Sequence, residues 1–428
     1  MDEIVALAKR RGFVFQSSEL YGGINGAWDF GPLGVELKRN IREAWWRDVV
    51  ELRDDIVGVE TAILMSPEVW RASGHLEHFT DLMVDCRTCK KRFRADQLQS
   101  DRCPSCGNAT LTEPRAFHMM FKTSVGAMED ASSVAYLRPE TAQGIFTDFK
   151  LVYQTARKKP PFGIAQIGKV FRNEITPGNF IFRSREFEQM ELEFFVRPQP
   201  EEEGLRWYRY WVEQRYDWFL RLGVQPERLR KREYSGADLA HYSRATTDIE
   251  YDYPFGWGEL EGIAHRGTFD LSQHVQGSGK DLAFFDEETK EKYLPAVVEP
   301  SVGVDRALLV FMLDAYEKEA DRTVLHLHPR LAPYKVAVFP LVRNKPEIVE
   351  LAANVERALR PAFRTVFDDS GNVGKRYYRQ DEIGTPLCVT VDYESLDGHD
   401  VTVRNRDSKL QDRVAIPKLE EYLRSKLS

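Results

Sequence analysis

The stretch from Phe171 to Phe195 constrains the fold more than any other part of this 428-residue sequence. It predicts two strands joined by a loop, because residues 176–179 (Thr-Pro-Gly-Asn) combine a proline that fixes φ with a glycine that permits positive φ. The second strand alternates with period two, which divides its side chains between two faces. One face carries Arg183, Arg185, Phe187, Gln189 and Glu191, and the other carries Glu188, Met190, Leu192 and Phe194.

The polar face of this hairpin suits a particular chemistry. On the first strand, Arg172 and Glu174 share a face, so the hairpin gathers arginines, carboxylates and the Phe187 ring on one surface. Guanidinium groups bind phosphate, a ring stacks on a base, and a carboxylate binds an ammonium group. The pattern therefore predicts a site for a nucleotide and a small cation. An amphipathic hairpin with a salt-bridged outer face is the alternative that alternation alone leaves open.

The length of the chain predicts two or three domains, because 428 residues exceed what one core normally holds. We expect a domain over residues 1–330 and a second over 331–428. The net charge of −7 makes no general case for a polyanionic partner, although a local basic face is enough for one. No apolar run has the length of a membrane-spanning helix, and the N-terminus lacks the order of a signal peptide. We therefore expect a cytosolic protein.

The first sixty residues predict a long helix and a strand. Gly31-Pro32-Leu33-Gly34 precedes a helix over 35–52 with an apolar stripe of Val35, Ile41, Ala44, Trp45 and Val49. Lys38, Arg39, Arg42 and Glu43 are expected mostly outside that stripe. An apolar run over 56–64 predicts a strand. Ser66 and Pro67 then predict the N-cap and first position of another helix.

Two CxxC pairs predict a metal site. Cys86 and Cys89 form the first pair, and Cys103 and Cys106 form the second. Four thiolates at this spacing are typical of tetrahedral zinc, and four cysteine ligands leave no open position for catalysis. We therefore expect structural zinc in an insertion over about 85–115, in preference to a redox pair or a disulfide. The flanking basic residues suit either a solvated loop or a contact with nucleic-acid phosphates.

Four further acidic or basic positions indicate a site. Glu140 precedes a predicted helix, and Glu259 and Glu261 are expected to share one strand face, where they suit either Mg²⁺ or a solvated edge. Arg306 lies one turn into a helix that follows Gly303. An arginine at a helix N-terminus is electrostatically unfavourable without an anion, so a phosphate partner is expected there.

Residues 331–428 predict a separate mixed sheet covered by helices, in the order β-α-β-α-β-β-α. Its cysteine, Cys388, lies in an apolar run and is expected to be buried. Its basic residues suit either a face for unstacked nucleic-acid bases or a solvated surface. They are Lys375, Arg376, Arg379, Arg404, Arg406 and Lys409.

Several of these stretches together resemble one protein family. FRNE followed by FRSREFEQMELEFF resembles motif 2 of the class II aminoacyl-tRNA synthetases, the helix after Gly31-Pro32 resembles motif 1, and EPSVGVDR resembles motif 3. FEQME, LRPETAQGIF and EPSVG resemble the homodimeric, class IIa glycyl-tRNA synthetases. The resemblance implies an α+β fold. It combines an antiparallel-sheet catalytic domain, with a zinc-knuckle insertion and a helical one over about 197–245, and a C-terminal α/β anticodon-binding domain.

The resemblance implies ATP-dependent attachment of glycine to tRNA(Gly) by a homodimer, through a glycyl-adenylate. Arg172 and Arg306 would hold the α- and γ-phosphates, Phe187 would stack on adenine, and Glu259 would accompany Mg²⁺. The wider ATP site would comprise Arg172, Asn173, Glu174, Phe182, Arg183, Ser184, Arg185, Glu186, Phe187, Glu259, Leu260, Gly303, Val304, Asp305 and Arg306. The glycine site would comprise Arg94, Glu140, Phe187, Glu188, Gln189, Met190, Glu191, Arg266, Glu299 and Ser301.

Two other functions compete with this one. A synthetase-like protein without catalysis, such as the accessory subunit of mitochondrial DNA polymerase, would be expected to lack the motif arginines, and both Arg172 and Arg306 are present. A class II enzyme for histidine, proline or threonine would be expected to have other residues where this sequence has the glycyl-type stretches FEQME, LRPETAQGIF and EPSVG.

Overall fold

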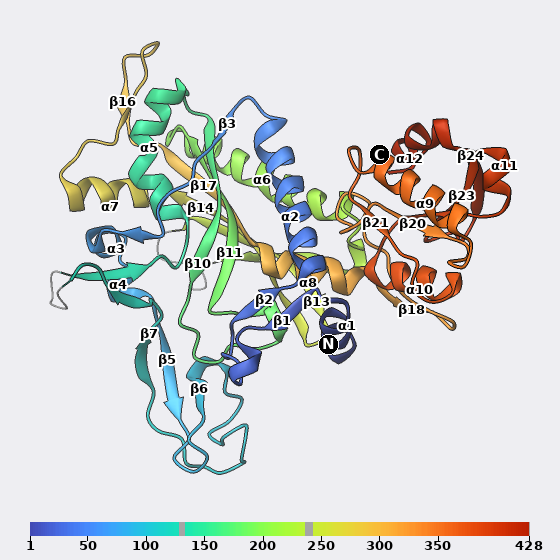
Figure 1. The fold of residues 1–428 in the computed structure, drawn as a ribbon. Helices are drawn as coiled ribbons and strands as arrows, with labels where there is room; N and C mark the ends of the chain where they lie inside the picture. The colour runs from blue at the N-terminus through green and yellow to red at the C-terminus, as the bar shows by residue number, and fades with distance from the viewer. Residues whose placement is uncertain (128–132, 236–242, 428) are drawn as a thin grey trace.

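A computed structural model describes residues 1–127, 133–235 and 243–427 of the chain. Its two largest sheets lie in separate parts of the molecule (Figure 1). The larger sheet has seven strands, antiparallel except for the edge pair β10–β3. Its order is β12 (Leu229–Tyr234), β13 (Ala245–Tyr253), β14 (Gly256–Gly267), β17 (Ala296–Gly303), β11 (Glu186–Val196), β10 (Phe162–Phe171) and β3 (Ile56–Gly58).

Helices cover both faces of this sheet (Figure 1). On one face the main core packs beneath α2 (Pro32–Trp46), α6 (Glu201–Arg221) and α8 (Val304–Ala315). On the other face a smaller aromatic cluster packs beneath α5 (Ala142–Ala156) and α7 (Phe269–Ser278). This second cluster covers only one end of its face, which leaves room for a cavity over the rest.

Strand β11 confirms the predicted alternation. Met190, Leu192 and Phe194 are fully buried in the main core, where their side chains supply most of the hydrophobic stabilisation of the central strand. The predicted partner strand is displaced along the chain: β10 ends at Phe171, and residues 172–185 form a loop that contains the short helix η4 (Phe180–Phe182). Arg172 and Glu174 therefore lie in a loop rather than on a strand face.

Helix α2 begins three residues earlier than predicted and passes into a π-helical turn, η2 (Arg47–Glu51). Its buried face contains Leu37 and Ile41 as well as the predicted Trp45. Two assignments to its faces were wrong: Val35 is 52% exposed, whereas Lys38 is 6% exposed. Lys38 is buried because it has two anionic partners on the sheet side of the helix.

The cysteine pairs lie in a small antiparallel sheet below the catalytic core (Figure 1). Its strand order is β6 (Arg92–Arg94), β5 (Thr80–Asp85) and β7 (Arg115–His118). A second small sheet has the order β4 (Leu64–Met65), β9 (Val134–Leu137) and β8 (Lys122–Ser124). The predicted strand over 56–64 is therefore two short strands in different sheets. Ser66 caps α3 (Pro67–Ala72) as predicted, and α4 (His75–His78) follows.

The C-terminal sheet has the order β21 (Thr365–Phe367), β20 (Val336–Pro340), β22 (Leu387–Val391), β23 (Asp400–Asn405) and β24 (Gln411–Ala415). Its first three strands are parallel and the last two are antiparallel, as a mixed sheet requires. Its helices are α9 (Pro346–Leu359), α10 (Val373–Ile383), α11 (Glu394–Gly398) and α12 (Leu419–Leu427). The predicted order lacked α11 and the edge strand β24. Cys388 is buried, as expected.

The two parts of the chain meet at three short elements. Helix α1 (Asp2–Arg11) lies against α10, and Arg10 and Arg11 form ion pairs with Glu382. The hairpin of β18 (Tyr316–Lys318) and β19 (Thr323–Leu325) also packs on α10. Other short pairs are β1 (Val14–Gln16) with β2 (Trp28–Phe30) and β15 (Phe284–Phe285) with β16 (Lys292–Tyr293). Within the described ranges, no helix combines the length and apolarity needed to cross a bilayer.

Candidate active site

An open cavity of about 410 Å³ lies on the face of the large sheet opposite α2. Strands β11, β14 and β17 form its floor, and the loop over residues 172–185 forms one wall. Glu140, Glu191 and Glu299 gather at one end of the cavity, where Arg266 binds Glu299, and Arg172 and Arg306 lie at the other end, where Arg306 pairs with Glu259. Its lining comprises Arg94, Glu140, Arg172, Glu174, Ile181, Phe182, Arg183, Ser184, Phe187, Gln189, Glu191, Thr246, Asp248, Glu259, Gly262, Ile263, Ala264, Arg266, Glu299, Ser301, Gly303, Asp305 and Arg306.

At the acidic end, Glu191 is held rigidly. One carboxylate oxygen accepts the backbone N–H of Thr141 at 2.8 Å and also its hydroxyl, and the other oxygen accepts the hydroxyl of Ser301 at 2.8 Å. Glu140 lies 3.4 Å from His75 Nε2. Burial acts to raise the pKa of Glu140, but the neighbouring His75 more than offsets this effect. The pKa is therefore lowered, and the carboxyl group stays ionised.

Glu299 completes the acidic end. One of its oxygens accepts a hydrogen bond of 2.8 Å from Arg266, whose other nitrogens bind Asp270. Burial raises the pKa of Glu299 to about 8, with further contributions from Glu191 and Glu140, while Arg266 acts to lower it. This end of the cavity is therefore short of positive charge and suited to a small cation.

At the other end, two arginines face the cavity beside aromatic rings. Arg306 contacts Glu259 through its backbone oxygen at 3.0 Å and its carboxylate at 3.2 Å, and its guanidinium lies 4.6 Å from the centre of the Phe182 ring. The guanidinium of Arg172 lies 5.5 Å from the centre of the Phe187 ring. Polyanions bind such clusters because guanidinium forks match phosphate oxygens.

A buried lysine connects three segments beneath the cavity. Lys38 of α2 forms ion pairs of 2.9 Å with Glu188 of β11 and 2.5 Å with Asp305 at the start of α8. All three side chains are largely buried, so loss of Lys38 would leave two buried carboxylates without their cation. The triad fixes α2 against the strand and the helix that support the cavity.

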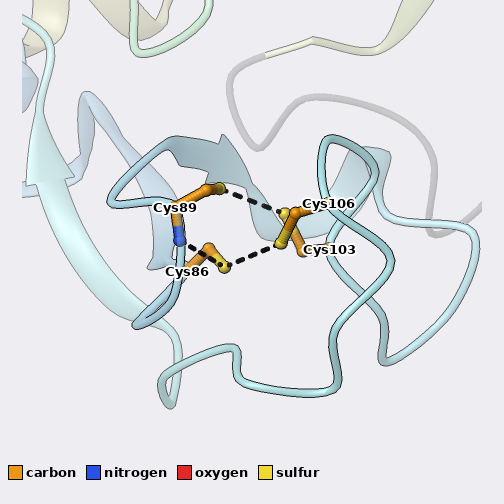
Figure 2. A group of neighbouring side chains, drawn as sticks. All are labelled: Cys86, Cys89, Cys103 and Cys106. Carbon is orange, nitrogen blue, oxygen red and sulfur yellow. Dashed lines mark hydrogen bonds between the residues drawn. The ribbon is translucent and has the colours of Figure 1, made fainter.

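The four cysteines predicted as metal ligands converge on one point (Figure 2). Their sulfur atoms all lie within 4.8 Å of one another, and Cys86–Cys106 and Cys89–Cys103 are each 3.6 Å apart. A tetrahedral zinc with bonds of about 2.3 Å requires sulfur–sulfur separations of about 3.8 Å, so the donor set fits that ion. Hydrogen bonds led by the Cys89 backbone N–H lower the pKa of Cys86 to about 6, which favours a thiolate.

Comparison with known proteins places this geometry in a family. The family described as "tRNA synthetase class II core domain (G, H, P, S and T)" matches residues 121–315, and "Anticodon binding domain" matches residues 335–426. The glycine–tRNA ligase of Streptomyces coelicolor is 53% identical over 456 aligned positions, which cover 100% of this chain and 98% of the relative. The chain belongs to the glycine–tRNA ligase family.

Other members of the glycine–tRNA ligase family match over the same extent. The Borreliella burgdorferi ligase is 53% identical over 438 positions, covering 100% of this chain and 97% of the relative. The Caldanaerobacter subterraneus ligase is 51% identical over 459 positions, covering 100% and 98%. The chain is thus a class II aminoacyl-tRNA synthetase with a catalytic core and a C-terminal anticodon-binding domain, and the glycyl resemblance is confirmed over the alternatives for other amino acids.

Some residues predicted for the ligase site lie outside the cavity. Glu188 and Met190 point to the opposite face of β11, because side chains alternate along a strand and Gln189 and Glu191 face the cavity. Leu260 and Val304 are buried in the main core. The others outside the lining are Asn173, whose backbone N–H binds Met119, Arg185, which binds Asn25 and Glu174, and Glu186, which pairs with Lys169.

A β-bulge overturns the predicted pairing of Glu259 and Glu261. The register between β13 and β14 shifts at Leu260, so one residue is inserted between the two glutamates. Glu259 faces the cavity and is half-exposed, whereas Glu261 is fully buried and receives a hydrogen bond of 2.7 Å from Arg215 of α6. Only Glu259 is therefore available to a metal–nucleotide complex.

Sequence reasoning did not select several polar groups in or beside the cavity. Asp248 accepts a hydrogen bond from Tyr234 at 2.7 Å, and burial, reinforced by Glu259, raises its pKa to about 6. Thr246 lies two residues away on the same strand. The alternation of side chains along β13 places both Thr246 and Asp248 on one face of the strand, but that face was not assigned to the cavity from the sequence. His75 carried no signal, because it reaches Glu140 only through the tertiary fold.

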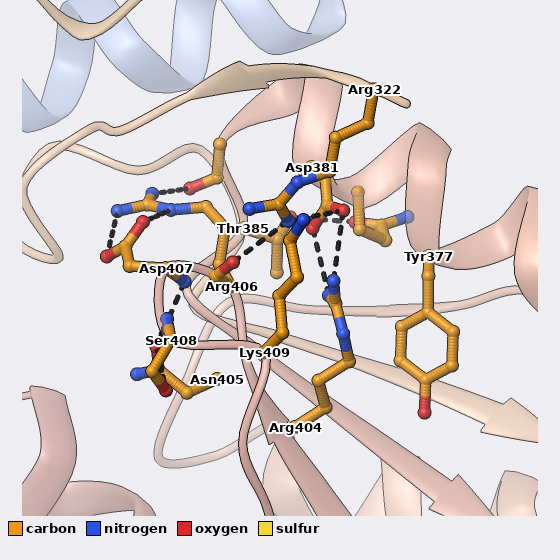
Figure 3. A network of polar contacts seen from close by, with 12 residues as sticks. Arg322, Tyr377, Asp381, Thr385, Arg404, Asn405, Arg406, Asp407, Ser408 and Lys409 are labelled. Carbon is orange, nitrogen blue, oxygen red and sulfur yellow. Dashed lines mark hydrogen bonds and ion pairs between the residues drawn. The ribbon is translucent and has the colours of Figure 1, made fainter. Parts of the chain in front are cut away.

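The predicted basic face of the C-terminal domain was wrong for its central residues. Arg376, Arg404 and Arg406 are almost fully buried. Figure 3 shows Arg404 and Arg322 converging on Asp381, with distances from 2.8 Å, while Arg406 binds Asp407. These arginines are committed to protein partners, so the surface that meets tRNA must use other groups.

Proposed function

We propose that the cavity on β11, β14 and β17 carries out both steps of glycine attachment to tRNA(Gly). The supporting observation is the separation of charge within one cavity: carboxylates at one end suit the glycine ammonium, and arginines at the other suit ATP. The glycine carboxylate attacks the α-phosphate of ATP, the bond to the β-phosphate breaks, and pyrophosphate leaves. A ribose hydroxyl of the tRNA terminus then takes the glycyl group and releases AMP.

This reaction needs no protein nucleophile, because positioning and charge stabilisation are sufficient for transfer at phosphorus. Arg172 holds the α-phosphate as negative charge develops, and Arg306 holds the γ-phosphate. Arg306 is paired with Glu259. When Mg²⁺–ATP binds, its phosphates would pair with this guanidinium and Glu259 would help to hold the metal. Phe187, beside Arg172, offers its ring to adenine.

Selectivity for glycine follows from the acidic end of the cavity. One extra methylene is worth only about 1–3 kcal/mol in an apolar pocket, so exclusion of alanine requires bulk against Cα. Glu140, Glu191 and Glu299 surround the ammonium, and Ser301 fixes Glu191 in place. Arg266 serves this end by holding Glu299 rather than by binding the glycine carboxylate.

The remaining features of the enzyme are part of the same proposal. The four cysteines hold structural zinc, and the domains divide at residues 330 and 331. The proposed helical insertion over 197–245 contains α6 and also β12, and its residues 236–242 lie outside the described residues. We expect a cytoplasmic homodimer that forms along α2, where Val35 is exposed.

Amino-acid-dependent ATP–pyrophosphate exchange tests the proposal, with glycine, alanine, serine, histidine, proline and threonine in parallel. Exchange with glycine alone supports it. Exchange with another amino acid overturns the specificity, and no exchange in folded protein with Mg²⁺ favours a non-catalytic relative. Glu191→Ala is expected to abolish glycine-dependent exchange, whereas Glu288→Ala, at an exposed surface pair, is expected to retain it. Full glycine activity in Glu191→Ala would contradict the assigned pocket.

A further inference from the structure

Glu193 is a buried carboxyl group that the proposed chemistry does not use. It lies on β11 two residues beyond Glu191, and period two places it on the cavity face of the strand. Its side chain is fully buried, and among the described residues neither of its oxygen atoms has a hydrogen-bond partner. An ionised carboxylate in such a place would be very unfavourable, so Glu193 is a neutral acid with a proton to donate.

The strand register identifies the group that faces Glu193. Glu191 pairs with Ser301 and Phe194 pairs with Val298, so Glu193 lies opposite Glu299 across β11 and β17. Directly opposed residues have Cβ atoms about 4.5–5.5 Å apart, which brings two glutamate carboxyl groups within reach of each other. Two ionised carboxylates there would repel strongly, and one shared proton removes that repulsion.

The surroundings supply few cations to this pair. Arg266 of β14 is the one guanidinium that the described contacts place there, and it gives two hydrogen bonds of 2.8 Å to Asp270 and one to Glu299. The other titratable groups that act on the pair are Glu191 on β11, Glu140 before α5 and Asp270 on α7, while His75 on α4 contacts Glu140 and His274 on α7 contacts Gln143. One oxygen of Glu299 is therefore left for a donor other than Arg266.

We propose that Glu193 is a positioning residue that stays protonated and donates a hydrogen bond to Glu299, so that the Glu299 carboxylate is held ionised toward the glycine ammonium. The inference rests on the proposed glycine site. The donated hydrogen bond stabilises the charged form of Glu299, and the ammonium group binds that form. A protonated Glu299 offers no charge to the substrate, so the KM for glycine rises as the pH falls below the ionisation of Glu299.

Two substitutions separate a neutral donor from an ionised carboxylate and from simple packing. Glu193→Gln keeps an uncharged donor of the same shape, and Glu193→Leu keeps the bulk without a donor. Exchange kinetics between pH 6 and 9 give the KM values for glycine and ATP. We expect Glu193→Gln to match the wild type. We expect Glu193→Leu to raise the KM for glycine about tenfold, because a hydrogen bond to a charged group is lost, with an unchanged KM for ATP. Its acidic limb should move to higher pH.

Each possible result of these measurements either supports or contradicts the role of Glu193. If Glu193→Gln behaves like Glu193→Leu, an ionised carboxylate is required and the inference is wrong. If Glu193→Leu matches the wild type, Glu193 has no positioning role. Thermal unfolding of both variants checks folding, and if Glu193→Leu does not fold, the pH profile of Glu193→Gln still decides between a neutral and an ionised residue. Absence of glycine-dependent exchange in the wild type would instead contradict the proposed function itself.

Discussion

Two clusters of arginines in this enzyme have opposite roles. In the catalytic core, Arg172 and Arg306 line an open cavity, where Arg172 donates a hydrogen bond of 3.0 Å to the backbone oxygen of Pro139 and Arg306 pairs with the half-exposed Glu259. In the C-terminal domain, Arg404 and Arg406 are buried against aspartates. The difference is one of placement. Arg172 follows the end of β10 and Arg306 lies at the start of α8, whereas Arg404 lies on β23 and Arg406 follows the end of that strand.

The comparison shows that a basic sequence does not by itself indicate a nucleic-acid surface. In the C-terminal cluster, Asp381 is fully buried between Arg322 and Arg404, so it joins the hairpin leaving the catalytic core to the second sheet (Figure 3). A cavity arginine is free to exchange its partner for a ligand. A buried arginine paired with a buried carboxylate is not free to exchange its partner, because separating the pair would leave a buried charge without a counter-ion or solvent.

The largest expected effect tests the structural cluster. Asp381→Ala leaves Arg322 and Arg404 buried without their shared anion, and we expect the free energy of unfolding to fall by about 3–5 kcal/mol. Urea unfolding measures it, with Asp397→Ala, at an exposed position, as the matched control. A change below about 1 kcal/mol would remove the distinction between the two clusters.

The catalytic cluster should respond in activity and not in stability. Arg306→Ala removes a preorganised donor, so kcat for pyrophosphate exchange should fall about 10²–10³-fold. The melting temperature should stay close to that of the wild type, because Arg306 lines a cavity. Arg209→Ala, which removes an exposed arginine on α6, is the control. Loss of stability in place of activity would mean that Arg306 belongs with the structural arginines.

The cysteine cluster extends the comparison to a third region. We expect one zinc ion per chain by elemental analysis, and a lower melting temperature after chelation, because metal binding stabilises the folded form. Cys103→Ser should lose the metal, whereas Cys388→Ala, in the other domain, should keep it. Absence of bound metal in protein prepared with zinc would contradict the assigned site.

The smallest effect is a pH dependence at the junction of the two domains. Hydrogen bonds from Arg322 and Lys409 lower the pKa of Glu319 to about 2 from 4.5. A lowered carboxyl pKa adds stability above pH 4.5, and that stability is lost as the pH falls toward 2. The difference in unfolding free energy between the wild type and Glu319→Gln should therefore shrink over this range. A difference in unfolding free energy that stays constant with pH would mean that Glu319 acts through packing and not through its charge.

The periodicity of the sequence correctly predicted side-chain directions that depend on a single strand. The alternation of β11 correctly separated Met190 and Leu192 from Glu191, because the pleat fixes these directions locally. The same rule failed at Glu259 and Glu261, since a bulge reverses the faces and leaves no mark in the alternation.

Predictions that depend on partners from distant segments were harder to make. Lys38 seemed to be a surface residue because its anions, Glu188 and Asp305, lie far along the chain. The arginines of the C-terminal domain were misassigned for the same reason, since Asp381 joins β23 only after folding. The cavity was largely predicted through motif resemblance, whereas Glu193 required the register between β11 and β17.

The contact between α1 and α10 has a consequence for how the two domains are held together. Arg11 of α1 pairs with Glu382 of α10, which lies 371 residues further along the chain. Closing such a long loop adds little equilibrium cost, because loop entropy grows only slowly with length. The pairing therefore links the two domains at a small entropic cost.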